Sequence, residues 1–574
     1  MQSVRSKKTT PEMNCMQASL RDPAIVMRLD RMGSFHQTRL SFMRALLRNL
    51  YHQKWRFIRT CWRIDEKGVG IAVYQVDGPS NSYSLICFAH DLPPEKRSDR
   101  VIATEWDATF TLFDGIPTDN DIERLKHHVP KQEAGHCSQS ELVLARANRS
   151  VRLFEHVVDC LSKGSQPNLE MIDSVGYLMR TTAVYGNGKF GISDRERIAD
   201  RPEFASAFHA ELLAVWLIRM FTIDIVEHLA RARAKESFVS LEPEIRRRLG
   251  VGNSTGLGMA PFLVLHPSLI HSWMMARETA LARVRSIKND SIESQNKFSE
   301  LLFRMMLGVE SWTTTDERQN KRIDALRKDL LKTTAYVKST GLESELAWHE
   351  LVIWSESELT LEGQELIVTL LIELHPELVD DLADTMAIDE AQYFPIDGSY
   401  SIAQSMALIE KEYGWAIELD FSKKSETARF WYYSEEKLEP RIGERYEEPG
   451  ADQEHPLSYA RDISVMYRDL RNFSKKGADS SVAEFLSQHP QHRHSLRRIQ
   501  TVHQLPYAEI QDNLISETML PVDLLRCKLS FFGANKFDPK SDRWVRINMY
   551  QHAPFPDELL DVYQDDWIYP PLLP

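Results

Sequence analysis

A chain of 574 residues is too long for one compact core, so its length predicts two to four domains. Its composition, with 43% hydrophobic and 27% charged residues, is that of an ordinary globular protein and excludes the disordered and fibrous classes. The 70 lysines and arginines against 83 aspartates and glutamates give a net charge of −13, so a nucleic acid is not the expected partner of the whole chain.

The first sixty residues are basic and lead directly into sequence that is typical of folded protein. An arginine-rich, acid-poor segment is typical of an arm that binds an anionic partner or of a mitochondrial presequence. We favour a third interpretation, a solvated helix followed by a strand, because aromatic residues follow without a break. The basic residues are Arg39, Arg44, Arg48, Lys54, Arg56 and Arg59, and the aromatic residues are Trp55, Phe57 and Trp62.

The usual sequence signals of secretion and membrane insertion are missing. No hydrophobic signal-peptide core is found near the N-terminus, and the longest apolar window, residues 210–230, contains four charged residues. The six cysteines are scattered and lack the spacing of a zinc site. We therefore expect a cytoplasmic protein with no membrane partner and no disulfide bond.

The N-terminal region, residues 1–135, is expected to contain a helix followed by a sheet. Residues 35–52 carry apolar side chains at helical spacing. Four segments rich in aromatic and β-branched residues follow, separated by turn sequences. They span residues 55–65, 69–78, 82–92 and 100–115, which predicts an antiparallel meander confined to about residues 53–115.

The middle region, residues 136–355, has helical periodicity nearly throughout. Pro202 predicts the start of a long helix that runs to about residue 235. Because this helix is apolar on most faces, we expect it to be the most buried element of the region, with Trp216, Phe221 and Ile225 inside.

One arginine lies within this long apolar helix. A buried guanidinium cannot stay unpaired, so Arg219 is expected to have an acidic partner. The candidates nearest in sequence are Glu211, Asp224 and Glu227.

The C-terminal region, residues 356–574, mixes helices and strands. Residues 363–386 have helical periodicity, whereas residues 415–421 and 426–434 are typical of a hairpin. Residues 528–533 and 543–551 predict two further strands around a loop. The three regions together predict an α+β fold that is predominantly helical.

The segment Gly250-Val-Gly-Asn-Ser-Thr-Gly256 contains three glycines and several small polar residues. A dinucleotide-binding turn or a nucleophile elbow would need a strand before it, but the preceding residues predict a short helix. Two interpretations remain. Asn253, Ser254 and Thr255, with free backbone amides, form a nest that binds a phosphate or carboxylate, or the glycines only supply left-handed turns between helices.

A second glycine-rich loop surrounds a lysine. Glycines flank Lys189 closely, together with Tyr185 and Asn187, and this favours a close approach of the backbone to a ligand. Residues 186–195 and 533–543 share a Gly-x-x-Lys-Phe pattern followed by Ser-Asp-Arg. Chance is the simpler explanation of this echo, but otherwise Lys536 and Arg543 would be a second cationic arm for an anionic group.

The histidines fall into two sets. His266 and His271 lie at the start of a predicted helix that follows the glycine segment, and they are candidates for proton transfer. His489, His492 and His494 lie among arginines that would repel a cation, so an exposed basic patch is favoured and no metal site is expected.

These observations favour a cytoplasmic enzyme that acts on a small anionic substrate. Lys189, His266 and His271 would be its catalytic residues, whereas the cofactor and the reaction class (lyase, transferase or hydrolase) stay open. The alternative is a non-catalytic scaffold that uses the aromatic N-terminal sheet and the basic segment as contact surfaces. Assembly into homo-oligomers is left open by the sequence. Convergence of residues 185–191 and 252–258 on one deep pocket would favour the enzyme.

Overall fold

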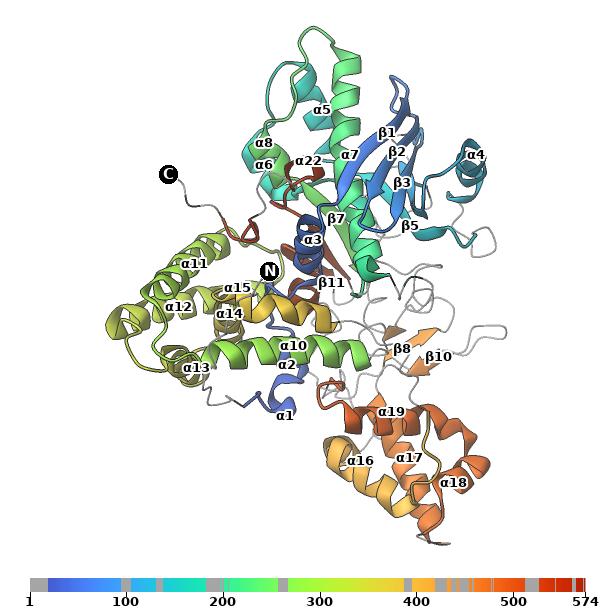
Figure 1. Cartoon of the computed structure of the whole chain (residues 1–574), viewed down its shortest axis with the longest axis vertical. Helices are drawn as coiled ribbons and strands as arrows, with labels where there is room; N and C mark the ends of the chain where they lie inside the picture. The colour runs from blue at the N-terminus through green and yellow to red at the C-terminus, as the bar shows by residue number, and fades with distance from the viewer. Residues whose placement is uncertain are drawn as a thin grey trace, which may run out of the picture.

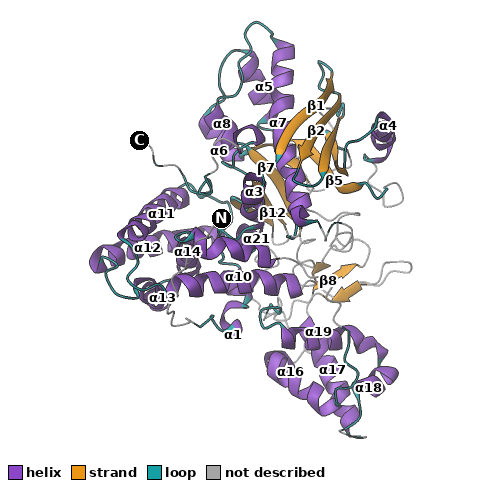
Figure 2. Cartoon of the chain, in the orientation of Figure 1, coloured by secondary structure: helices purple, strands orange, loops and turns teal. Residues whose placement is uncertain are grey.

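The computed structural model is a predominantly helical α+β protein built around one large sheet (Figure 1), which confirms the predicted fold class. Figure 2 shows the strands of the large sheet gathered in the upper half of the molecule, with a second, small sheet at β8 in the lower half. The structure describes residues 19–93, 105–130, 138–181, 198, 201–204, 206–256, 267–386, 395–418, 431–434, 441–442, 454–456, 459–475, 477, 479–510, 526–541, 544–559, 564–570 and 572.

Within these residues, nine strands form one mixed sheet in the order β1-β2-β3-β4-β5-β6-β7-β12-β11. All neighbouring strands run antiparallel except β6 and β7, which run parallel. The first four are the predicted meander. The strands are β1 (Arg56–Ile64), β2 (Gly70–Asp77), β3 (Ser82–Ala89), β4 (Ala108–Asp114), β5 (Glu141–Arg149), β6 (Tyr177–Thr181), β7 (Gly250–Gly256), β11 (Lys536–Ser541) and β12 (Trp544–Met549).

Side chains of the meander alternate between the two faces of the sheet, and a helix covers each face. Ala72 and Tyr74 of β2 belong to the main core with helix α7 (His209–Arg233), and the Tyr74 hydroxyl donates to Asp224 of that helix at 2.7 Å. Val73 belongs to a smaller cluster with α4 (Asp119–His128), which lies on the other side of the sheet (Figure 1). The period of two in the sequence therefore produces a three-layered arrangement.

Helix α7 is the buried central helix that the sequence predicts. The side chains of Trp216, Phe221 and Ile225 are all 0% exposed, which confirms that prediction. The helix begins seven residues later than expected, because Pro202–Phe204 forms a separate 3-10 turn (η4). Phe208 is left-handed, with φ of 61°, so the helix cannot continue through it and begins at His209.

The remaining helices of the first half are mostly short, and all except α1 (Pro23–Val26) and α2 (Leu29–Met32), which lie beside helices from the middle of the chain, are close to the sheet. Helices α3 (Phe42–His52) and α5 both pack against α7. The full set is α1, α2, α3, α4, α5 (Phe154–Ser162), α6 (Leu169–Val175), η4, α7 and α8 (Pro243–Arg248), with α21 (Lys528–Phe532) and α22 (Pro556–Leu559) added from the C-terminal region.

A group of helices from the middle of the chain lies beside the sheet (green to yellow in Figure 1). Its central helices are α10 and α14. Their apolar side chains belong to the same hydrophobic core as those of the sheet. The group consists of α10 (Pro267–Arg285), α11 (Ile292–Glu310), α12 (Glu317–Thr340), α13 (Ala347–Glu358), α14 (Leu361–Ile372), α15 (Pro376–Val379) and the 3-10 helix η5 (Asp380–Met386).

A smaller helical unit has a hydrophobic core of its own (orange in Figure 1). Capping boxes at Ser401 and Ser481 begin two of its helices. It consists of α16 (Ile402–Ile417), α17 (Tyr459–Ser474), α18 (Val482–Gln488), the 3-10 turn η6 (Pro490–His492) and α19 (Arg493–Gln504), with a three-stranded sheet of β8 (Trp431–Ser434), β9 (Arg441–Ile442) and β10 (Glu454–Pro456) nearby.

Several expected elements differ from the structure. The sheet is not confined to residues 53–115, because β5 and β6 lie in the region predicted to be helical. Residues 415–417 end α16, so they do not form a hairpin with β8. Residues 528–532 form a helix rather than a strand, because Phe531 packs into an aromatic cluster with Phe42 and Trp273, and such packing overrides β propensity.

Part of the basic N-terminal segment is buried, which contradicts the predicted solvated helix. Arg44 on α3 is 0% exposed and forms ion pairs with Glu373 and Asp565. Arg39 and Arg48 are also buried and contact Asp565 at 3.0 and 2.7 Å. These arginines therefore join α3 to the end of α14 and to the C-terminal segment, and they are not a surface for an anionic partner.

The large sheet contains strands from all three predicted regions, so it crosses both boundaries, at 135/136 and 355/356. The domain division by region stays a prediction. No helix in the described part of the chain combines the length and hydropathy needed to span a bilayer. Cys61, Cys87, Cys160 and Cys527 carry free thiols, and Cys15 and Cys137 lie outside the described residues.

Candidate functional site

A cavity of about 410 Å³ lies where the N-terminal segment, helices α11, α12 and α14, and the β11 edge of the sheet meet. A volume of this size is suited to a small metabolite. Its wall includes the polar and aromatic residues His36, Gln37, Trp312, Gln319, Arg322, Glu362, Arg526 and Asn535.

Glu362 is the negatively charged residue at the centre of this polar wall. It lies in the first turn of α14, and Arg526 donates to its two oxygens at 2.6 and 3.1 Å, with Ser34 Oγ at 3.2 Å. Burial alone would raise the pKa of the Glu362 carboxyl, but the charge of Arg526 and the neighbouring His36 outweigh it and hold that pKa well below its usual range. Glu362 is therefore ionised at neutral pH.

His36 lies next to this carboxylate. Its side chain is almost fully buried, its Nε2 is 3.4 Å from Glu362 Oε2, and its ring stacks on Trp312 with 6.0 Å between ring centroids. Neither ring nitrogen has a hydrogen-bond partner among the described residues, so Nε2 approaches Glu362 only at ion-pair distance and Nδ1 is open. A histidine oriented by a carboxylate on one side and open on the other has the arrangement that proton transfer requires.

The charges of the cavity wall do not cancel. Among the described residues that line it there are three arginines (Arg248, Arg322 and Arg526) and two acidic residues (Asp173 and Glu362), so three minus two leaves a formal charge of +1 for this part of the wall. Cation excess in a partly enclosed space attracts an anionic ligand more strongly than the same charge in water.

Several buried polar atoms of the wall lack a hydrogen-bond partner among the residues that the structure describes. They include two donors, Arg526 Nε and Gln319 Nε2, and two acceptors, Gln37 Oε1 and Asn535 Oδ1. Buried polar atoms in folded proteins are nearly always paired, and the exceptions lie mostly where water or a ligand binds. The wall therefore offers hydrogen bonds of both kinds to a bound molecule.

The glycine segment at residues 250–256 does not belong to this site and is not a loop. It forms β7, which pairs with β6 on one side and with β12 on the other. Residues 250–253 take part in the pairing with β6 and residues 251–256 in the pairing with β12, so the segment is an extended strand and the expectation of loop amides that form an anion-binding nest is wrong.

The glycines of β7 permit close packing in the sheet. A Cβ atom on Gly252 would lie 2.8 Å from the ring of Tyr177, and one on Gly250 would lie 2.4 Å from the carbonyl oxygen of Met549. Neither glycine adopts a positive φ, so the alternative of left-handed turns is wrong as well.

The three small polar residues of the segment lie along the same strand. Asn253 is 1% exposed, and its side-chain amide donates to the carbonyl oxygen of Thr181 at 3.1 Å, which links β7 to β6. Ser254 and Thr255 lie opposite Arg546 and Val545 of β12. A substrate-binding role for these three residues stays a prediction.

His271 lies on α10, away from the residues that line the cavity. The backbone N–H of Tyr507 donates to its Nδ1 at 3.2 Å, and burial lowers the pKa of His271 to about 4. The imidazole is therefore neutral at physiological pH, and its role in proton transfer stays a prediction.

The other predicted site residues are only partly covered by the structure. Lys536 begins β11 opposite Asn548, between two residues that line the cavity, Asn535 and Phe537. The roles of the remaining residues stay predictions, because they lie outside the described residues: Tyr185, Asn187, Lys189, His266 and Arg543.

Arg219 is buried as expected, but its predicted acidic partner is wrong. Its guanidinium donates to the backbone carbonyl oxygens of Leu249 at 2.6 Å and Ala553 at 2.7 Å and lies 3.8 Å above the centre of the Phe555 ring. No carboxylate within the described residues lies at ion-pair distance from it. Carbonyl oxygens at the end of α8 and before α22 satisfy its donors, which sequence spacing along α7 could not indicate.

The expected exposed basic patch at residues 489–494 is also wrong in part. His492 is only 6% exposed, and its Nε2 lies 2.7 Å from Asp469 Oδ2. His494 is exposed, as expected.

The cavity has few signals in the amino-acid sequence. His36, Glu362 and Arg526 are separated by hundreds of residues, and none belongs to a recognisable motif. One signal was present: Glu362 lies at the start of a helix that continues into a mostly apolar run at residues 366–372, and a charge in such a place needs a partner.

No protein-family model, no curated protein and no solved structure matches the chain. The residues of the cavity and their geometry therefore carry the functional argument.

Proposed function

We propose that this protein is an enzyme that binds a small molecule with a carboxylate or phosphate group in the cavity beside His36, Glu362 and Arg526. One observation carries the proposal. A buried cluster of His36, Glu362 and Arg526 lines the same cavity as several buried polar atoms that have no hydrogen-bond partner among the described residues, and the cavity is large enough for a metabolite.

The anionic group would bind at the arginine side of the cluster. Arg526 keeps its Nε donor while its two Nη atoms hold Glu362, and Gln319 Nε2 is a second donor. Charge-assisted hydrogen bonds from a guanidinium favour carboxylate and phosphate over neutral groups. The acceptors Gln37 Oε1 and Asn535 Oδ1 would then hold hydroxyl or amine groups of the same ligand.

His36 is the candidate for the chemical step. The ionised Glu362 carboxylate at 3.4 Å stabilises the imidazolium that forms when His36 accepts a proton. Stacking on Trp312 fixes the plane of the ring, so that Nδ1 has a defined direction. The class of reaction stays open between lyase, transferase and hydrolase.

The alternative of a scaffold protein has less support. It relied on the basic segment and the aromatic sheet as contact surfaces, but Arg39, Arg44 and Arg48 are buried in ion pairs. Phe57 of the sheet packs edge-on against Trp216 of α7 with 5.0 Å between ring centroids, so it faces the core.

A thermal-shift series on the full chain tests the proposal. Inorganic phosphate, citrate and phosphate monoesters are compared with neutral alcohols and amides at equal concentration and ionic strength. An anion at a hundred times its Kd should stabilise the protein by about 2.7 kcal/mol, and the neutral compounds should not. Equal effects of anions and neutral compounds, or no effect at millimolar concentration, would contradict the proposal.

A further inference from the structure

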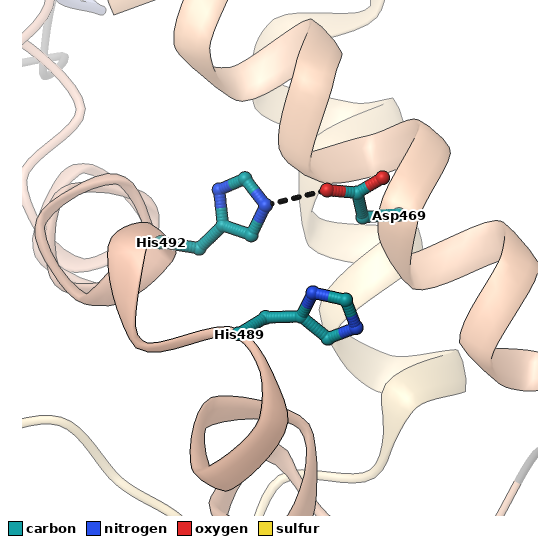
Figure 3. A group of neighbouring side chains, drawn as sticks. All are labelled: Asp469, His489 and His492. Atoms are coloured by element: carbon teal, nitrogen blue, oxygen red, sulfur yellow. Dashed lines mark hydrogen bonds and ion pairs between the residues drawn. The ribbon is translucent and has the colours of Figure 1, made fainter.

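The small helical unit carries a second cluster of side chains that is suited to a ligand. Asp469 lies on α17, His489 follows the last residue of α18, and His492 ends η6. Figure 3 shows the two imidazoles and the carboxylate facing one another from these elements. One ligand atom from each residue lies within 4.8 Å of the others.

Aromatic packing orients the two imidazoles. The Phe485 ring stacks on His489 with 4.8 Å between centroids and on His492 with 5.7 Å, at interplanar angles of 27° and 7°. Phe473 contacts His489 edge-on. Because these contacts fix both rings, the cluster does not have to be ordered from a flexible state when an ion binds.

From the sequence, the neighbouring arginines are expected to repel a cation and so to disfavour a metal, and the structure weakens this expectation. Arg498 points into the helical core, where it pairs with Glu509 and lies over the Tyr459 ring. Arg493 is exposed and donates to His494 at 3.1 Å. The buried arginine charge is thus balanced by a carboxylate of its own.

We propose that Asp469, His489 and His492 bind a divalent transition-metal ion of the Zn²⁺ type. Neutral imidazoles and a carboxylate are the donors that such ions prefer, and two histidines with one acid leave a position open for water. Tetrahedral ligands at about 2.0–2.1 Å from zinc lie about 3.3 Å apart, so small side-chain rotations are enough to close the cluster on an ion. The ion would replace the hydrogen bond of 2.7 Å between His492 and Asp469.

Bound metal would join three elements of the helical unit. Asp469 holds α17, and the two histidines hold the turn between α18 and α19. Binding to the folded state alone stabilises that state, so the ion should raise the unfolding temperature of this unit. This inference does not depend on the cavity, whose wall residues belong to other helices.

The test is a titration of chelator-treated full-length protein with Zn²⁺, followed by a chromophoric competitor, and with Co²⁺, followed by its visible absorption. We expect one tight equivalent, at least tenfold weaker binding in His489→Gln and Asp469→Asn, and a cobalt band typical of four-coordinate nitrogen and oxygen ligands. His494→Gln is the matched control, because it removes an exposed imidazole two residues from the cluster.

Three results would overturn the proposal. They are no binding at 100 micromolar Zn²⁺, equal affinity in His489→Gln and His494→Gln, and binding in the wild type that leaves the unfolding temperature unchanged. Circular dichroism of His489→Gln must match the wild type before titration. If it does not, the comparison is made with Asp469→Asn, whose side chain keeps the same size.

Discussion

Arg526 holds both carboxylate oxygens of Glu362, through Nη1 at 2.6 Å and Nη2 at 3.1 Å, across 164 residues of chain. Both side chains are buried and line the same cavity. A buried pair of this kind seldom adds stability compared with apolar residues, so its presence in a cavity wall favours a role in binding. The Nε atom of Arg526 is left for another acceptor.

Replacing Glu362 with glutamine should have two effects of opposite sign. The unfolding free energy should fall by about 3–5 kcal/mol, because Arg526 loses its buried counterion. Anion affinity should rise, because a negative charge beside the binding group is removed. Urea unfolding and anion titration measure the two effects, with the exposed Glu310→Gln as control. Weaker anion binding in the folded Glu362→Gln variant would contradict the proposed geometry.

Arg44 links α3 to the C-terminal half of the chain, and its removal should be costly. Arg44→Met removes the closest cation of Glu373 and one of the three arginines that contact Asp565, which should lower the unfolding free energy by about 3–5 kcal/mol. Arg56→Met removes an exposed arginine on β1 and should change it by less than about 0.5 kcal/mol. Denaturant unfolding with both variants checks this, and similar values for the two would show that Arg44 is solvated after all.

Gly252→Ala tests whether residues 250–256 form a strand. The added methyl group would lie 2.8 Å from the Tyr177 ring, and overpacking of this kind destabilises by about 1–3 kcal/mol. Gly414→Ala on α16 is the control, because nothing lies within 4 Å of its added Cβ and alanine favours a helix. If Gly252→Ala is as stable as the wild type in calorimetry, the segment is the open loop that the sequence suggested.

Protonation of His552 should make stability depend on pH. Burial, together with the charges of Arg248 and Arg219, lowers the pKa of His552 to about 4, whereas an unfolded histidine titrates near about 6.5. Between these values only the unfolded chain binds the proton, so stability is complete above about pH 6.5 and falls as the pH decreases toward 4.

The measurement is the unfolding temperature of wild type and His552→Asn between pH 7.5 and 5. Asparagine is chosen because it tolerates the positive φ of 67° at this position. In His552→Asn the unfolding temperature should fall less with decreasing pH than in the wild type. His127→Gln, which replaces an exposed histidine on α4, should show the same fall as the wild type. An unchanged slope in His552→Asn would mean that this histidine is accessible to protons in the fold.

The sequence predicted local structure well where its periodicity was strong. The meander and α7 were found because their apolar residues repeat at two and at 3.6 residues over long stretches. β7 was missed because a strand of Gly, Asn, Ser and Thr has no apolar pattern, and its pairing with β6 and β12 involves segments far along the chain. The strand prediction for residues 528–532 was wrong for the converse reason: their aromatic residues are typical of a strand, but they pack as a helix.

The candidate site could not be found in the same way. His36, Glu362 and Arg526 come from three distant segments, and only the fold makes them neighbours. The sequence shows that His489 and His492 are neighbours, but it does not show that Asp469 on α17 lies beside them. From the sequence alone, the arginines nearby therefore weigh against a metal site. Long-range pairing of charges follows from tertiary structure, and spacing within one helix, as for Arg219, indicates it poorly.

The most direct test of the cavity as an anion site compares two neighbouring cations on α12. Arg322 lines the cavity, whereas Lys321 is exposed and pairs with Glu317 at 2.8 Å. Arg322→Met removes one of the positive charges of the cavity wall and should weaken binding of the stabilising anion about ten- to a hundredfold, or about 1.5–3 kcal/mol, as measured by calorimetric titration. Lys321→Met removes the same charge one residue away and should leave the affinity within about twofold. Equal weakening in both variants, or none in Arg322→Met, would contradict an anion site in this cavity.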